Sequence, residues 1–169
     1  MKIVYTYNQH KVSEGWLTMG LNSFDFVVKN DDGTLAIIDI KNKRNFSVED
    51  ARKLRRNIMV HDMMRSKYFV LISQDQGYLW DNEKSAGIWD MPFISFSMNE
   101  VISRYYKSIG LDETRLRRNE LELIVAQWIY DLVRLGEGRS FTTEPEKTLA
   151  EGGFIDIIQG ANVHSEVQA

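Results

Sequence analysis

The chain has 169 residues, of which 43% are hydrophobic and 27% are charged, and its formal net charge is −3. This length predicts a single domain over residues 1–169 with one hydrophobic core. No apolar run approaches the roughly 20 residues that span a bilayer, and the N-terminus lacks a signal-peptide pattern, so we expect a cytoplasmic protein with no membrane partner.

Cysteine is absent from the sequence. Disulfide bonds, thiolate zinc sites and cysteine nucleophiles are therefore excluded. The three histidines, His10, His61 and His164, are too widely spaced to suggest a metal-binding cluster. Any bound metal is therefore expected to have oxygen ligands. Basic residues concentrate between Lys41 and Lys67, which predicts a local positive surface despite the negative net charge.

The first 20 residues contain only weak structural signals. Lys2 to Tyr7 alternates loosely between apolar and polar residues and predicts a short strand. Asn8 to Gly20 has no clear period. It fits either a short helix around Glu14 to Met19 or a strand around Trp16 to Met19.

The next stretch predicts a β-hairpin. Two strand-forming runs, Phe24 to Val28 and Leu35 to Ile40, flank the turn-forming residues Asn30 to Gly33. A three-residue loop, Asp31 to Gly33, is a common connection of this kind, with Gly33 in the left-handed conformation. We therefore expect two paired antiparallel strands here.

Each strand of this hairpin carries one aspartate, and the register brings the two together. If Asn30 pairs with Thr34, then Asp25 lies opposite Asp39. Because side chains alternate across a strand, Lys41 shares the face of Asp39. The hairpin therefore predicts that Asp25, Asp39 and Lys41 form one polar patch.

Two opposed carboxylates repel each other, so this patch needs a compensating charge. A divalent cation is the usual compensation, and Lys41 is a partial one. Mg²⁺ prefers oxygen ligands and often takes only one or two carboxylates from the protein. The sequence therefore predicts a cation site at Asp25 and Asp39, with the backbone carbonyl of Ile40 as a further ligand.

A helix is predicted to follow the hairpin. Ser47 to Asp50 resembles a capping box, and helical spacing continues to about Met63 or Met64. The apolar positions that would pack on the sheet are Val48, Ala51, Leu54 and Ile58. Arg52, Arg55 and Arg56 lie on an adjoining face, which is either a solvated basic face or, beside the carboxylates, a phosphate-contacting surface.

An apolar run after this helix, Lys67 to Ser73, predicts a buried central strand. Gln76-Gly77 would turn the chain into Tyr78 to Trp80, as a hairpin partner or an extension. Asp81 to Pro92 is expected to be irregular. Trp80 and Trp89 are interpreted as core or rim packing.

The last third is predicted to be mainly helical. Met98 to Ser108 forms one helix, and a longer helix runs from Glu113 or Thr114 to about Leu135. Its apolar stripe packs against the sheet or a second copy of the chain, and consists of Leu121, Ile124, Val125, Trp128, Leu132 and Leu135. Residues 136–151 read as a loop, Phe154 to Ile158 as a final strand, and the end from Gly160 as frayed.

The order of these elements resembles the core of the PD-(D/E)XK nuclease superfamily, which has the restriction-endonuclease-like fold. The residues that carry the resemblance are Phe24-Asp25 and Asp39-Ile40-Lys41, followed by a helix and an apolar strand. The run from Lys41 to Asn57 is similar to small uncharacterised bacterial members of that group. The resemblance covers about Leu21 to Ser73, within a nuclease core of about 21–80 that is followed by C-terminal helices and a tail over 97–169.

The resemblance implies an α/β (α+β) domain with a mixed central sheet flanked by helices. It implies that Asp25 and Asp39 bind Mg²⁺ or Mn²⁺, and that Lys41 orients or activates the attacking water. The family's core begins with a helix that can contribute an acid, and the region around Glu14 would take that place here.

The expected function is therefore that of a hydrolase that cleaves DNA phosphodiester bonds with a metal ion and no organic cofactor. Lys43, Arg44, Arg52, Arg55 and Arg56 would hold backbone phosphates without reading bases. A homodimer is plausible because cutting both strands often needs two active sites. Two alternatives remain: a catalytically inactive nuclease-fold module that binds nucleic acid or a partner protein, and a structural protein in which Asp39 and Lys41 form only a weak surface ion pair.

Overall fold

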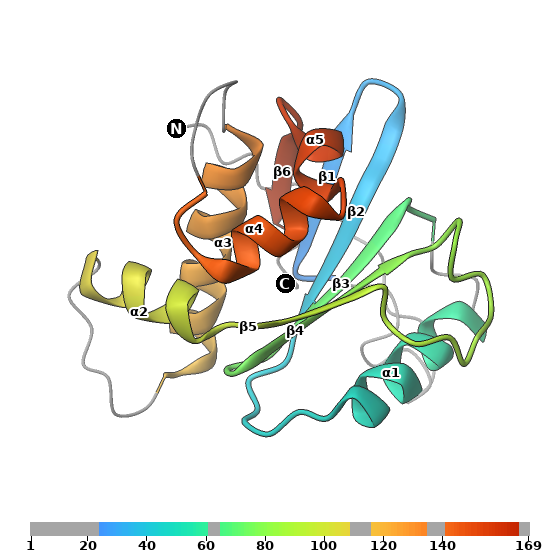
Figure 1. Cartoon of the computed structure of the whole chain (residues 1–169), viewed down its shortest axis with the longest axis horizontal. Coiled ribbons are helices and arrows are strands. Elements are labelled where there is room, and N and C mark those ends of the chain that lie inside the picture. The colour runs from blue at the N-terminus through green and yellow to red at the C-terminus, as the bar shows by residue number, and fades with distance from the viewer. Residues whose placement is uncertain (1–23, 61–64, 109–115, 135–140, 166–169) are drawn as a thin grey trace, which may run out of the picture.

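A computed structural model describes residues 24–60, 65–108, 116–134 and 141–165 (Figure 1). Within these ranges the chain forms a mixed α/β fold. The elements, in chain order, are β1 (Phe26–Asn30), β2 (Gly33–Ile40), α1 (Val48–Val60), β3 (Tyr68–Ile72), β4 (Gln76–Asp81), β5 (Ile94–Ser97), α2 (Asn99–Ser108), α3 (Arg118–Val133), α4 (Glu144–Glu151), α5 (Phe154–Ile158) and β6 (Asn162–Ser165). None of the described helices is long and apolar enough to cross a membrane.

The strands of the described ranges form one six-stranded mixed sheet in the order β5-β4-β3-β2-β1-β6. β2 and β3 are parallel and are joined through α1, whereas every other neighbouring pair is antiparallel. All five residues of β3 are buried, which confirms the predicted central strand. The predicted mixed sheet flanked by helices is confirmed at this level.

Helices cover both faces of the sheet, and the strands alternate between two cores. The larger core lies under α2, α3, α4 and α5, while the smaller one lies under α1 (Figure 1). In β2, Ile38 and Ile40 point into the larger core and Ile37 points into the smaller one. Since side chains alternate, Asp39 belongs to the face that α1 covers.

The hairpin turn is one residue shorter than predicted. Asn30 pairs with Gly33 and not with Thr34, which leaves Asp31 and Asp32 as the loop. The Oδ1 atom of Asn30 accepts hydrogen bonds from the N–H groups of Asp32 (3.0 Å) and Gly33 (3.1 Å). This side-chain cap closes the tighter turn, and Gly33 adopts a φ of +136° that favours glycine.

The predicted register near the aspartates nevertheless holds. The strand pairing slips once inside the hairpin, where β2 carries an extra residue, Leu35. Beyond the slip Phe26 pairs with Ile38. One position farther along, Asp25 therefore lies opposite Asp39.

The helix after the hairpin begins where the capping pattern predicts. The Ser47 hydroxyl accepts a hydrogen bond from the Asp50 N–H at 3.1 Å, and α1 starts at Val48. Ala51 and Ile58 are buried against the sheet, as their spacing predicts. The predicted end at Met63 or Met64 lies outside the described residues.

Gly77 lies inside strand β4 and is not the predicted turn. A Cβ atom at this position would lie 2.1 Å from the Phe96 ring of the neighbouring strand β5. Glycine is therefore needed here because an aromatic ring occupies the space above the backbone. The predicted core position of Trp80 is confirmed, since its side chain is fully buried.

The C-terminal predictions are partly wrong. Residues 144–151 form helix α4 and not a loop, because Thr143 and Glu146 build a capping box. Phe154–Ile158 is helix α5 and not a strand. Its buried residues, Phe154, Ile155 and Ile158, follow helical spacing after Gly153, which has a φ of +79°.

The chain beyond Gly160 is not frayed where it is described. β6 (Asn162–Ser165) pairs with β1 along the sheet edge. The two predicted helices before it are confirmed as α2 and α3, and the described part of the α3 stripe, from Leu121 to Leu132, is buried. The predicted start at Glu113 or Thr114, Leu135 and all predictions for residues 1–23 lie outside the described residues.

Candidate functional site

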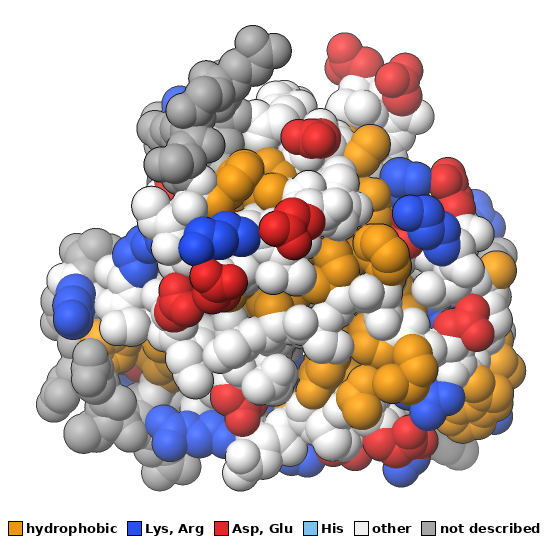
Figure 2. Space-filling view, viewed as in Figure 1, with side chains coloured by type: hydrophobic (Ala, Val, Ile, Leu, Met, Phe, Trp, Pro, Cys, Tyr) orange, Lys and Arg blue, Asp and Glu red, His pale blue; other side chains and the backbone are white. Residues whose placement is uncertain are grey.

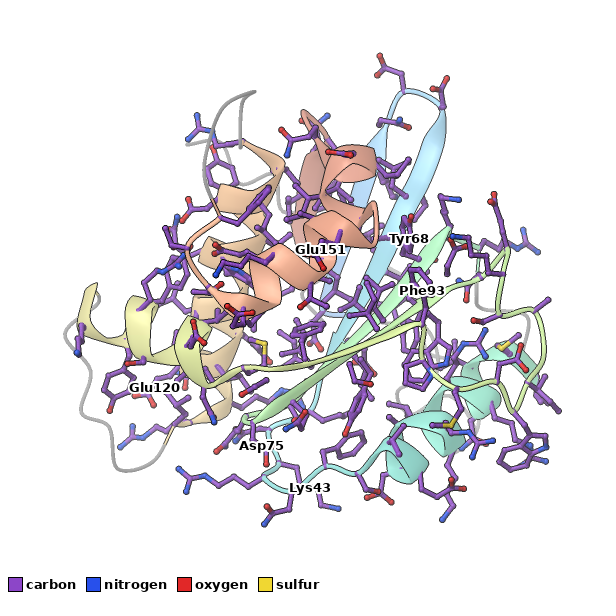
Figure 3. The ribbon with its side chains drawn as sticks, viewed as in Figure 1. Lys43, Tyr68, Asp75, Phe93, Glu120 and Glu151 are labelled. Carbon is purple, nitrogen blue, oxygen red and sulfur yellow. The ribbon has the colours of Figure 1, made fainter. Side chains whose placement is uncertain are left out.

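The candidate site lies at the end of the sheet where β2 leaves it. The Lys41 N–H donates to the Ile72 carbonyl at 2.8 Å, and the Gln74 N–H donates to the Lys43 carbonyl at 3.2 Å. The loop after β2 therefore runs beside the turn between β3 and β4. Figure 3 shows Lys43 and Asp75 at this same end of the molecule, away from Tyr68 at the start of β3.

Asp25 and Asp39 form a close and largely buried pair at this end, which we call the carboxylate pair. Their side chains are 16% and 10% exposed. Burial raises the pKa of Asp25, and repulsion from Asp39 raises it as well. The Ile40 N–H, which donates to the Asp25 Oδ2 at 2.6 Å, opposes this rise without cancelling it. The pair therefore resists carrying two negative charges.

One cationic side chain reaches each member of the carboxylate pair. Lys41 Nζ lies 3.0 Å from Asp39 Oδ2, as the shared face of β2 predicts. Arg118 Nη2 lies 3.3 Å from Asp25 Oδ1, and this contact was not predicted. Arg118 is the first residue of α3, so only the packing of that helix brings it to the sheet end. Its position in the sequence carries no signal of this contact.

The donor atoms of the carboxylate pair suit a hard divalent cation. Two carboxylates are the number that Mg²⁺ often takes from a protein. The described residues contain no group of three or more Asp, Glu, His or Cys side chains arranged for a metal. Glu14, the predicted further acid, lies outside the described residues. The Ile40 carbonyl stays a predicted ligand, and the Ile40 N–H donates to Asp25.

Arg55 does not belong to the predicted phosphate-contacting surface, because this residue is only 1% exposed. The guanidinium donates to the carbonyl oxygens of Gly87 (2.9 Å) and Ser85 and to the Asn82 side chain (3.2 Å), and it stacks over the Trp80 ring. Buried donors with these partners cannot reach a nucleic acid, so Arg55 anchors the segment between β4 and β5.

Arg52 and Arg56 hold the same segment from the surface. The Arg52 Nε donates to the Trp89 carbonyl at 3.0 Å, and Arg56 lies 4.6 Å from the centre of the Trp89 ring. Trp89 itself is 45% exposed and belongs to the rim. Figure 2 shows apolar side chains that gather over this segment, among interspersed charges of both signs. The arginines of α1 therefore mainly hold the segment between β4 and β5, through its backbone carbonyl groups and its Trp89 ring.

Lys43 and Arg44 are the predicted phosphate contacts that remain exposed beside the site. The Lys43 side chain is 61% exposed and lies 4.0 Å from Asp50. The Arg44 Nε donates to the Gln74 side chain at 3.0 Å. Both residues lie within three positions of Lys41 in the loop after β2, which keeps them near the carboxylate pair.

The sequence and the structure were compared with known proteins. No family model matches, and no curated protein and no solved structure is significantly similar. The description of the site therefore rests on the contacts of Asp25, Asp39, Lys41 and Arg118 alone.

Proposed function

We propose that this chain is a metal-dependent nuclease of the PD-(D/E)XK type that hydrolyses DNA phosphodiester bonds in the cytoplasm. The observation that carries the proposal is the convergence of Asp25, Asp39 and Lys41 at one end of the sheet. The succession of hairpin, crossover helix and parallel strand supports the restriction-endonuclease-like form of the fold. A partly buried pair of carboxylates lowers the stability of the fold, and groups with such perturbed ionisation are typical of functional sites.

In this proposal the carboxylate pair holds Mg²⁺ or Mn²⁺, with the Ile40 carbonyl as a further ligand. The bound ion would polarise a phosphate oxygen and lower the pKa of a coordinated water. Lys41, beside Asp39, orients the attacking water and supplies positive charge where negative charge develops at phosphorus. Arg118, which contacts Asp25, would be available as a phosphate contact beside the pair.

Cleavage assays with matched variants test the proposal. The wild-type chain is expected to cut plasmid or single-stranded DNA with Mg²⁺ or Mn²⁺, and Asp39→Asn and Lys41→Ala are expected to lower the rate at least about 100-fold. Asp32→Asn and Lys29→Ala are the controls, since these exposed residues lie on the same hairpin. Cleavage that survives Asp39→Asn and Lys41→Ala would contradict the assigned site.

A catalytically inactive module that binds nucleic acid or a partner protein is the second candidate. It is favoured by the ion pairs of Asp39 with Lys41 and of Asp25 with Arg118, which compensate both carboxylates without a metal. DNA binding that weakens with salt, with no cleavage in either metal, would select this module.

A homodimer is also part of the nuclease proposal, and sedimentation with and without DNA tests it.

A further inference from the structure

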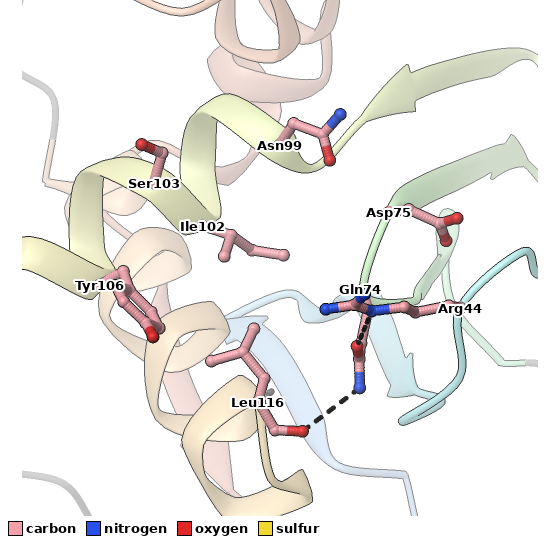
Figure 4. Close-up of a pocket in the computed structure, with 8 residues that line it drawn as sticks. All are labelled: Arg44, Gln74, Asp75, Asn99, Ile102, Ser103, Tyr106 and Leu116. Carbon is pink, nitrogen blue, oxygen red and sulfur yellow. Dashed lines mark hydrogen bonds between the residues drawn. The ribbon is translucent and has the colours of Figure 1, made fainter. Parts of the chain in front are cut away.

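A cavity of about 370 Å³ opens between α2 and the turn that joins β3 to β4. Its volume lies in the range of small-molecule sites, about 300–1,000 Å³. Figure 4 shows residues of α2 on one side and those of the turn and the loop after β2 on the other. We call this cavity the base pocket, and its walls include Arg44, Gln74, Asn99, Ile102, Ser103 and Leu116.

We propose that the base pocket holds a nucleobase of the substrate strand, close to the phosphate at the carboxylate pair. This inference rests on the proposed nuclease function and names a substrate contact that the function alone does not require. The pocket would then bind the strand at a second point beside the carboxylate pair. Two independent observations support this proposal: the chemistry of the pocket walls and the short chain connections between the pocket and the carboxylate pair.

The walls of the pocket suit a flat, uncharged ring with polar edges. Ile102 and Leu116 supply apolar contact, and Asn99 and Ser103 supply donors and acceptors. Among the described residues, the Asn99 amide group and the Ser103 hydroxyl have no hydrogen-bond partner, whereas the backbone N–H of Asn99 donates to the Ser97 hydroxyl at 3.2 Å. An amide and a hydroxyl at the edge of an apolar wall are the groups that read the edge of an unstacked base.

The charges of the pocket favour a base over a phosphate inside it. Arg44 and Asp75 both line the cavity, so their charges offset each other. The Asp75 carboxylate accepts hydrogen bonds from the Asn45 N–H (2.8 Å) and the Ser73 hydroxyl (3.0 Å), which keep it in place. The pocket therefore has no net positive charge to attract a phosphate, and a neutral base needs none.

Two short connections place the pocket beside the carboxylate pair. Arg44 is three residues after Lys41, and an extended chain of that length spans at most about 11 Å. On the other side, Leu116 is two residues before Arg118, which contacts Asp25. The Gln74 side chain, which donates to the Leu116 carbonyl at 3.4 Å and accepts from Arg44, ties these two connections together. A base in the pocket therefore belongs to a nucleotide near the reacting phosphate.

Oligonucleotides with one abasic residue, moved along the strand, test this contact in cleavage assays. We expect the wild-type chain to show a KM about tenfold higher when the abasic residue falls at one position near the cut. Ser103→Trp, which fills the pocket, should raise KM for the intact strand and abolish the dependence on position. Lys107→Trp is the control, because Lys107 is exposed on the same helix outside the lining.

A binding measurement separates this inference from the nuclease proposal. Oligonucleotides with 2-aminopurine at successive positions are titrated with Asp39→Asn, with and without Ser103→Trp or Asn99→Ala. A fluorescence change at one position, lost in both pocket variants, supports the base pocket even if the wild-type chain cuts nothing. Equal signals at all positions, or signals unchanged in folded pocket variants, would overturn it even if the wild-type chain cuts DNA.

Discussion

Asp25 shows the conflict between stability and a candidate functional site at the scale of one residue. Its carboxylate is compensated by the Ile40 N–H and by Arg118, yet its pKa stays above the ordinary value because burial and Asp39 oppose ionisation. A folded protein binds that proton more tightly than the unfolded chain does. The stabilisation from this proton is complete below the ordinary pKa of 3.8 and is lost as the pH rises through the raised pKa.

Asp25→Asn should therefore stabilise the fold at neutral pH. The amide keeps an acceptor for the Ile40 N–H and carries no charge, so we expect an increase of about 0.5–2 kcal/mol in the free energy of unfolding. The difference should shrink as the pH approaches 3.8. Urea denaturation over this pH range measures it, with Asp32→Asn on the same hairpin as the control. A less stable Asp25→Asn protein at neutral pH would mean that the Arg118 ion pair outweighs the repulsion.

Arg118 is the residue that sequence reasoning had no means to find. An arginine at the start of a helix is ordinary in sequence, and its partner Asp25 lies 93 positions away. The Asp39–Lys41 contact, by contrast, follows from alternation along one strand. A local rule therefore predicted one cation of the site, and the packing of α3 supplied the other.

At the scale of an element, helix α1 was predicted correctly in its position, but its arginine face makes contacts that were not predicted. Its start and its apolar positions followed from capping and spacing. Its arginines appeared exposed because the sequence between β4 and β5 gives no sign that it folds back over them. The carbonyl groups of Ser85, Gly87 and Trp89 turn this face into an anchor.

Arg55→Lys is expected to destabilise the protein by about 2–3 kcal/mol, because lysine cannot satisfy all the buried acceptors that the guanidinium reaches. Thermal or urea unfolding measures the loss. Lys53→Gln, at an exposed position of the same helix, should stay within about 0.5 kcal/mol of wild type. An Arg55→Lys protein as stable as wild type would contradict this anchoring role.

Glu146 joins three helices and so belongs to the scale of the whole molecule. Its carboxylate, on α4, accepts from Arg104 of α2 at 2.6 Å and from the Trp128 Nε1 of α3 at 3.3 Å. Burial alone would raise the pKa of Glu146, but Arg104 and the N–H groups of Thr142 and Thr143 outweigh burial and lower it. Its ionised form therefore stabilises the packing of α2, α3 and α4 on the sheet.

Glu146→Gln is expected to cost about 3 kcal/mol at neutral pH, since it leaves Arg104 without its partly buried partner. Because the pKa of Glu146 is lowered in the folded state, its contribution is present above the ordinary pKa of 4.5 and is lost as the pH falls through the lowered pKa. The variant and wild type should thus converge in acid. Denaturation as a function of pH measures this, with the exposed Glu151→Gln on the same helix as the control. A constant gap in acid would contradict the role of the charge.

The sequence by itself determined the features that depend on neighbouring residues. Capping chemistry predicted the start of α1, the buried run predicted β3, and the turn residues predicted the hairpin. Even the opposed positions of Asp25 and Asp39 followed, although a shorter turn and an extra residue in β2 produce them. These features are local because hydrogen bonds and side-chain alternation within a few residues decide them.

Only the tertiary structure decided the burial of Arg55, the approach of Arg118 to Asp25 and the pairing of β6 with β1. It also made a helix of Phe154–Ile158, a short apolar run that fits a strand equally well. The physical reason is the same in each case. Burial and strand pairing depend on which distant segments pack together, and the residues next to each of these positions do not indicate which distant segment will pack there.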